Sequence, residues 1–95
     1  MDKVQKHVFL SGRVQGVGFR HFTRQEALRL NLNGWVRNLR DGRVEVWMEG
    51  TPENTERMMS RLQEGPRSAN VTDITVKEET TGGSEYRSFQ VKPTV

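Results

Sequence analysis

Apolar and polar residues alternate over residues 6–14 and 43–49, which is the pattern of strands with one buried face. Residues 35–40 predict a further strand, because the dipeptide Asp41-Gly42 that joins them to residues 43–49 suits the positive φ angles of a tight hairpin. In residues 43–49 we expect one face to belong to the core and the opposite face to be largely solvated. The residues expected to face the core in these strands are Val8, Leu10, Val14, Val44, Val46 and Met48.

Two other stretches have apolar residues at helical spacing. The first predicted helix covers residues 19–31 and ends at Asn33-Gly34, since glycine suits the C-cap region. The second starts at Thr51-Pro52-Glu53, where threonine caps, proline takes the first helical position and the acid meets the positive helix end; it stops at Gly65-Pro66. The stripes expected to be buried are Phe19, Phe22, Thr23, Ala27 and Leu30 in the first helix and Thr55, Met58, Met59 and Leu62 in the second.

The last third of the chain predicts a strand over residues 71–79, a turn over residues 81–84 and a final strand over residues 86–92, with Phe89 and Val91 on its inner face. The order of elements is therefore strand, helix, strand, strand, helix, strand, with the last strand region split in two. This is the split βαβ arrangement of a ferredoxin-like fold. We expect one α+β domain over residues 1–95, a βαββαβ sandwich whose antiparallel sheet carries two helices on one face.

Composition excludes several classes of site. The chain has no cysteine, so it has no disulfide, thiolate metal site or cysteine nucleophile. Two histidines are too few for a histidine-built metal cage. No apolar run approaches the roughly 20 residues of a membrane span, and the start MDKVQKH lacks an apolar signal stretch. We therefore expect a cytoplasmic protein with no membrane partner, no metal and no cofactor.

The positive charge is concentrated in one half of the chain. Residues 13–43 contain seven arginines and two carboxylates, whereas residues 44–95 contain six basic and nine acidic residues. This imbalance suits an anionic ligand, either a phosphate ester or anhydride or a nucleic acid. A solvated arginine-rich surface is the alternative explanation.

The segment from Gln15 to Arg20 connects a predicted strand to a predicted helix. The first amides of a helix have no intrahelical acceptor, so a glycine-containing turn before them suits a tetrahedral anion. Gly16 and Gly18 permit close approach, and Arg20 adds a planar, permanently charged guanidinium. An ordinary tight turn with a surface arginine is the alternative, and His21 is expected to be a partly exposed helix residue.

Asn38 lies inside a predicted strand, where asparagine is disfavoured. Its amide has both an acceptor and donors, so it is able to accept a hydrogen bond from a water and donate to a substrate oxygen. The alternative is an asparagine that satisfies backbone groups near the hairpin.

Two segments together resemble the signatures of the acylphosphatase family. The first is GRVQGVGFR, residues 12–20, and the second is GWVRN, residues 34–38, followed by Gly42, Val44 and Gly50. The similarity in the order of elements extends over nearly the whole chain. It implies a βαββαβ domain that hydrolyses acyl phosphates, the mixed anhydrides of carboxylic acids and phosphate, to a carboxylate and inorganic phosphate.

The resemblance also implies roles for individual residues. Arg20 is the essential phosphate-binding arginine, and Asn38 orients the attacking water. The expected partner is a small acyl phosphate, with phosphate or sulfate as product or mimic, and the expected enzyme is a metal-independent monomer. The loop that binds phosphate through its main-chain N–H groups consists of Gln15, Gly16, Val17, Gly18 and Phe19, and it leads into Arg20.

The sequence departs from the family at two positions and leaves two competing functions. Many relatives carry a small hydroxyl residue where this chain has Leu39, and a bulky residue where it has Gly18. One competing function is an RNA- or protein-binding module without catalysis, although the candidate stacking strands offer only Phe9 and Trp47 and no nucleic-acid partner is expected. The other is a degenerate domain with a regulatory role, but the chain keeps both Arg20 and Asn38.

Overall fold

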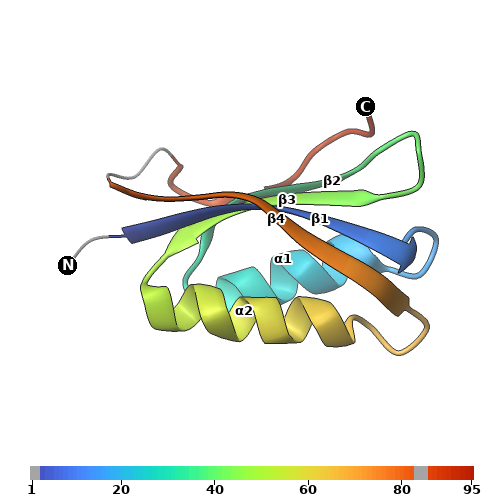
Figure 1. Ribbon diagram of the computed structural model, residues 1–95, viewed down its shortest axis with the longest axis horizontal. Coiled ribbons are helices and arrows are strands. Elements are labelled where there is room, and N and C mark those ends of the chain that lie inside the picture. The colour runs from blue at the N-terminus through green and yellow to red at the C-terminus, as the bar shows by residue number, and fades with distance from the viewer. Residues whose placement is uncertain (1–2, 83–85) are drawn as a thin grey trace.

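The computed structural model describes residues 3–82 and 86–95 (Figure 1). Within these residues the order strand, helix, strand, strand, helix, strand is confirmed, and a short fifth strand follows. The elements are β1 (Lys3–Arg13), α1 (Phe19–Arg29), β2 (Asn33–Asn38), β3 (Val44–Gly50), α2 (Pro52–Glu64), β4 (Asn70–Gly82) and β5 (Phe89–Val91).

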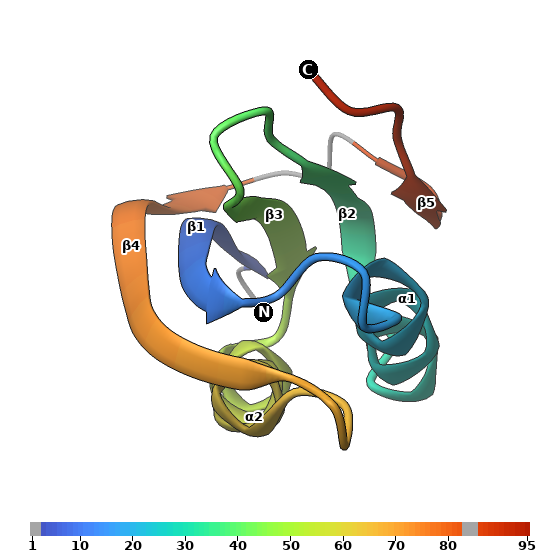
Figure 2. The ribbon, with the colours of Figure 1, turned by 90° about the vertical axis from the view of Figure 1, so that its right-hand side faces the viewer.

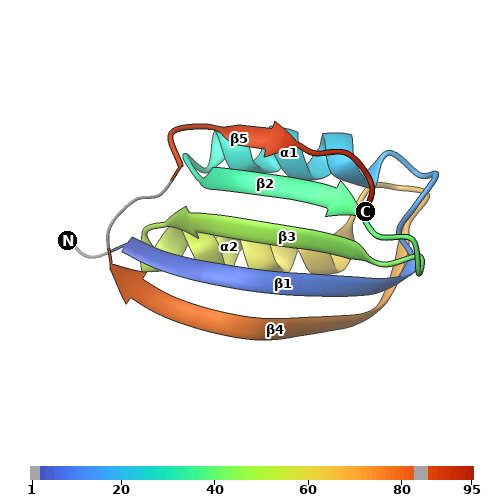
Figure 3. The same cartoon turned by 90° about the horizontal axis from the view of Figure 1, so that it is seen from above.

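The sheet has the strand order β4-β1-β3-β2-β5, which Figure 3 shows from above. The first four strands are antiparallel neighbours, which confirms the ferredoxin-like arrangement. The expectation of a wholly antiparallel sheet was wrong at one edge, because β5 pairs with β2 in parallel. β4 and β2 run in opposite directions. Because β5 runs opposite to β4, it is parallel to β2 when it pairs with β2 at the far edge of the sheet.

Several predicted boundaries were wrong. Residues 81–82 continue β4 in register with β1, where a turn was expected, and residues 83–84 of that predicted turn lie outside the described residues. The final strand covers three residues, where seven were expected. Gly34 caps no helix: it lies in β2 at a φ of 136°, and a Cβ there would meet the carbonyl oxygen of Trp47 at 1.9 Å. Glycine at this position therefore serves the close approach of β2 and β3.

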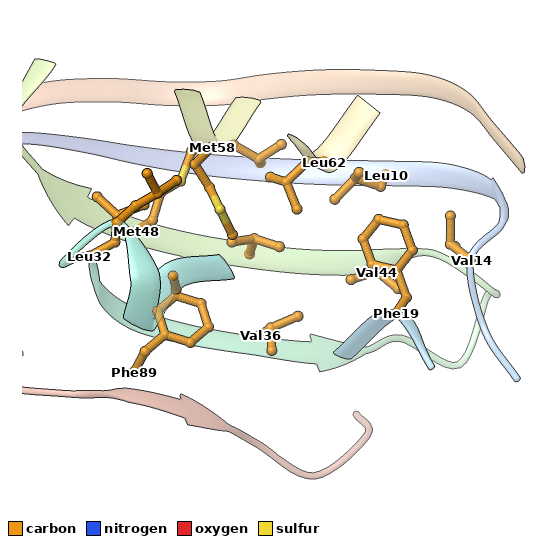
Figure 4. Close-up of a cluster of buried hydrophobic side chains, with 14 residues drawn as sticks. Leu10, Val14, Phe19, Leu32, Val36, Val44, Met48, Met58, Leu62 and Phe89 are labelled. Atoms are coloured by element: carbon orange, nitrogen blue, oxygen red, sulfur yellow. The ribbon is translucent and has the colours of Figure 1, made fainter. Parts of the chain in front are cut away.

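Both helices cover one face of the sheet, as Figure 2 shows end-on. The apolar residues that were expected to face the core in β1 and β3 do so, and they pack between the sheet and the helices (Figure 4). In α1 and α2, Phe22 and Met59 are only half-buried, while the rest of the expected stripes is buried. Each fully buried leucine, methionine or phenylalanine stabilises this core by about 1.5–3 kcal/mol.

The two helix starts differ in a way that matters for the site. The Thr51 hydroxyl accepts a hydrogen bond from the Asn54 N–H at 3.1 Å, as a capping threonine does, and Pro52 follows in the first helical position. α1 begins after Gly18, which has a left-handed backbone and offers no side-chain cap. The amides at the start of α1 are therefore available to another acceptor.

The helix-free face of β3 was expected to be largely solvated, and this expectation was wrong. Glu45 is 5% exposed and Glu49 is fully buried. The carboxylate of Glu45 accepts hydrogen bonds from Arg37 on β2 at 2.7 Å and pairs with His7 on β1 at 2.5 Å. Long side chains of the neighbouring strands therefore bury the carboxylates by pairing with them.

We expect acid to weaken the fold partly through Glu45. Burial raises the pKa of this carboxyl, but the hydrogen bonds from Arg37 and His7 outweigh burial, and the pKa lies below the ordinary value of 4.5. A carboxylate with a lowered pKa in the folded state stabilises the fold above its unfolded pKa, and this stability is lost as the pH falls through the folded pKa. Urea unfolding from about pH 6 to about pH 3 measures this dependence.

The matched comparison is Glu45→Gln against Glu78→Gln, which changes an exposed residue of β4. Stability of the Glu45→Gln variant is expected to fall less steeply with acid than that of the parent, and Glu78→Gln to follow the parent closely. Equal slopes for all three proteins would contradict the role given to Glu45.

Candidate functional site

The turn between β1 and α1 exposes the first amides of the helix. Gly16 and Gly18 have φ angles of 73° and 79°, in the left-handed region that favours glycine. The first backbone hydrogen bond of α1 runs from the Phe22 N–H to the Gly18 carbonyl at 3.0 Å. The N–H groups of Phe19 and Arg20 therefore have no acceptor within the helix, and the first turn holds no acidic residue to neutralise them.

This turn forms one wall of a pocket of about 340 Å³, whose other walls come from the ends of β2 and β5. Residues from three separated parts of the sequence therefore meet here. The lining residues are Val14, Gln15, Gly16, Gly18, Phe19, Arg20, His21, Asn38 and Val91.

Every sequence-predicted site residue except Val17 lines this pocket. The Val17 side chain is half-buried and packs against the hydrophobic core instead. His21 is exposed at the pocket, in agreement with its expected position on the helix surface. Sequence reasoning missed Val91, which was expected to face inward but is 43% exposed at the pocket, while its neighbour Phe89 is buried in the core.

Arg20 carries a charge that no described residue neutralises. In the part of the chain that the structure describes, its guanidinium makes no ion pair and no side-chain hydrogen bond, whereas Arg37 and Arg61 each pair with a carboxylate. None of the described residues that line the pocket is acidic. The pocket is therefore positively charged, which suits an anion.

Asn38, the last residue of β2, has an unusual side chain. Its Oδ1 is the one buried side-chain nitrogen or oxygen atom in residues 3–82 and 86–95 that has no hydrogen-bond partner. A buried acceptor without a partner costs about 1–3 kcal/mol, and such groups are rare unless they have a task. The alternative that Asn38 satisfies the hairpin backbone is not supported, because Gln15 makes those hydrogen bonds instead.

The described ranges, 3–82 and 86–95, contain no group of three or more histidine, cysteine, aspartate or glutamate side chains placed to hold a metal ion. No helix within the same ranges combines the length and the apolar character that crossing a bilayer demands.

Comparison with known proteins gives a consistent result. The family model described as Acylphosphatase matches residues 6–91. A curated acylphosphatase from Pseudomonas paraeruginosa is 52% identical over 77 residues, with 81% of this chain and 85% of the relative covered. One from Synechococcus sp. is 46% identical, with 99% of this chain and 98% of the relative covered. The crystal structure of acylphosphatase from Bacillus subtilis superposes with a TM-score of 0.89 at 37% identity, covering 94% of this chain and 98% of that one.

Proposed function

The chain belongs to the acylphosphatase family, and from this premise we propose how its pocket hydrolyses acyl phosphates. One observation carries the proposal: the pocket is lined by Arg20, by the uncapped start of α1 and by Asn38, and within the described residues the Arg20 guanidinium has no ion-pair partner and the Asn38 amide oxygen has no hydrogen-bond partner. The first two bind a phosphoryl group, and the third binds a water beside it. The alternative of a binding module without catalysis is not favoured, because the relatives that match over most of the chain are named as acylphosphatases.

The phosphoryl group binds at the start of α1. Its oxygens accept hydrogen bonds from the main-chain N–H groups of the loop from Gln15 to Phe19, and the helix dipole favours their negative charge. Arg20 adds two parallel donors that match the geometry of two phosphate oxygens. Inorganic phosphate and sulfate present the same tetrahedral oxygens, so both are expected to bind as product and mimic.

The nucleophile is a water held by Asn38. The Oδ1 atom accepts a hydrogen bond from this water, which leaves an oxygen lone pair free to attack phosphorus. As the new P–O bond forms, the bond between phosphorus and the acyl oxygen breaks, and the carboxylate leaves with that electron pair. The proton of the attacking water goes to the phosphate product or to solvent.

This reaction makes modest demands on the protein. A carboxylate is a good leaving group, so protonation of the leaving oxygen is not needed. Catalysis then comes from alignment of the water and from fixed positive charge around the equatorial oxygens in a loose transition state. Arg20 and the helix amides supply that charge, and we propose that the reaction requires no metal ion.

Release of phosphate from benzoyl phosphate in the presence of EDTA tests the proposed function. We expect turnover at an unchanged rate when EDTA is added, and competitive inhibition by inorganic phosphate or sulfate. Absence of turnover by the folded chain would contradict the function, and loss of activity on addition of EDTA would contradict the metal-independent mechanism.

We further propose that residues 1–95 act as a single cytoplasmic domain and as a monomer. The single hydrophobic core that both helices share with the sheet supports the single domain. Size-exclusion chromatography with light scattering checks the monomer directly. A dimer at assay concentrations would contradict it.

A further inference from the structure

The side chain of Gln15 links the two halves of the pocket. Gln15 follows β1 and opens the loop, and its Nε2 donates to the Leu39 carbonyl at 2.7 Å and to the Arg43 carbonyl at 2.9 Å. Both carbonyls belong to the turn between β2 and β3. The two hydrogens of one amide group are therefore used to hold the hairpin against the loop.

The hairpin end is already closed by its own backbone. The Leu39 N–H donates to the Arg43 carbonyl at 2.8 Å, and the Gly42 N–H donates to the Leu39 carbonyl at 3.1 Å. Gln15 therefore uses the second lone pair of each carbonyl, and the turn itself does not need it to form. The Gln15 amide instead fixes the position of the turn between β2 and β3 relative to the phosphate-binding loop.

Both ends of this link adjoin the groups that the mechanism uses. Gln15 is the first residue of the phosphate-binding loop, and Leu39 follows Asn38. The hydrogen bond from Gln15 is accepted by the main-chain carbonyl of Leu39. The unusual leucine side chain at this position therefore does not affect the hydrogen bond. A displacement of about 1 Å between water and phosphorus slows a reaction that depends on alignment by up to about 10²-fold.

We propose that Gln15 is a positioning residue, whose side-chain amide sets the distance between the phosphate-binding loop and the water held by Asn38. This inference rests on the proposed function. Gln15 contributes to turnover through Asn38. It does not change the affinity with which Arg20 and the helix amides bind phosphate. Its removal is therefore expected to lower kcat more than it weakens phosphate binding.

The test measures kcat and KM for benzoyl phosphate, and the inhibition constant of inorganic phosphate, in Gln15→Ala and Gln15→Met. Methionine keeps the length of the side chain but has no N–H donor, so it separates the lost hydrogen bonds from a lost volume and preserves the test if the alanine variant folds poorly. We expect kcat to fall about 10-fold, while KM and the inhibition constant change by less than about 3-fold. The control is Gln63→Met, which alters an exposed residue of α2 and is expected to keep the parent kinetics.

A double-mutant cycle with Asn38→Ala separates positioning from a merely structural role. If Gln15 acts through Asn38, Gln15→Met has almost no further effect on kcat once Asn38 is alanine. Equal effects in both backgrounds, or a normal kcat in Gln15→Met, would overturn the inference while an active parent still upholds the proposed function. An inactive parent would instead overturn the proposed function.

Discussion

Replacing Arg20 with alanine is expected to lower kcat/KM for benzoyl phosphate by about 10³-fold or more. Arg20 has no carboxylate partner among the described residues, and its pocket holds no acidic side chain. Alanine therefore removes the one arginine charge of the pocket lining. A guanidinium contacts phosphate oxygens in both the bound substrate and the transition state. We therefore expect KM to rise and kcat to fall.

The same lack of partners predicts that Arg20→Ala keeps its fold. Among the described residues the side chain makes no ion pair or hydrogen bond that the substitution would break, so the free energy of unfolding is expected to stay within about 0.5 kcal/mol of the parent. Arg24→Ala is the matched control: Arg24 is an exposed arginine one turn further along α1 and does not line the pocket. Steady-state kinetics and urea unfolding of both variants check the prediction. Parent-like turnover in Arg20→Ala would remove Arg20 from the mechanism.

Lysine at position 20 makes the test sharper. It retains the charge but presents a compact ammonium in place of a planar fork, so it does not reproduce two parallel hydrogen bonds. We expect Arg20→Lys to recover only a small part of the lost activity. Full recovery would show that charge alone is sufficient and that bidentate geometry is unimportant.

The candidate site could be proposed from the sequence because two short segments carry it. The residues from Gln15 to Arg20 are contiguous, and a glycine-containing turn before a helix indicates an anion site by local rules alone. Asn38 was conspicuous because a strand interior disfavours asparagine. That these two segments meet follows from the ferredoxin-like topology, in which the end of β2 lies beside the turn that precedes α1.

The elements that sequence reasoning misjudged depend on long-range contacts. Val91 reaches the pocket only because β5 joins the edge of the sheet that β2 forms, and the pattern of residues 86–92 carries no signal for its partner strand. Glu45 and Glu49 alternate with core residues in the manner of solvated positions, yet partners on β1, which lies far away in the sequence, help to bury them. The link from Gln15 likewise joins residues 24 and 28 positions apart. Local periodicity identifies which face a residue occupies and does not identify what covers that face.

Replacing Asn38 with alanine is expected to lower kcat by about 10²-fold with little change in KM. A group that orients the attacking water acts mainly in the transition state, whereas Arg20 and the helix amides continue to bind the substrate phosphate. The affinity for inorganic phosphate is therefore expected to stay close to that of the parent. A kcat near the parent value would contradict the water-holding role.

The unpartnered oxygen also predicts an unusual effect on stability. Because Asn38 Oδ1 has no hydrogen-bond partner among the described residues, alanine breaks no hydrogen bond within that part of the protein, and the free energy of unfolding is expected to stay within about 0.5 kcal/mol of the parent. Asn33→Ala is the matched control on the same strand: it breaks the 3.1 Å hydrogen bond from Nδ2 to the Tyr86 carbonyl and is expected to lose about 1 kcal/mol with kcat intact. Kinetics and urea unfolding are therefore expected to show opposite patterns for the two variants. Asn38→Ala loses rate without losing stability, and Asn33→Ala loses stability without losing rate. If Asn38→Ala instead lost stability and kept its rate, the oxygen would serve the fold, and the water would have to be held elsewhere.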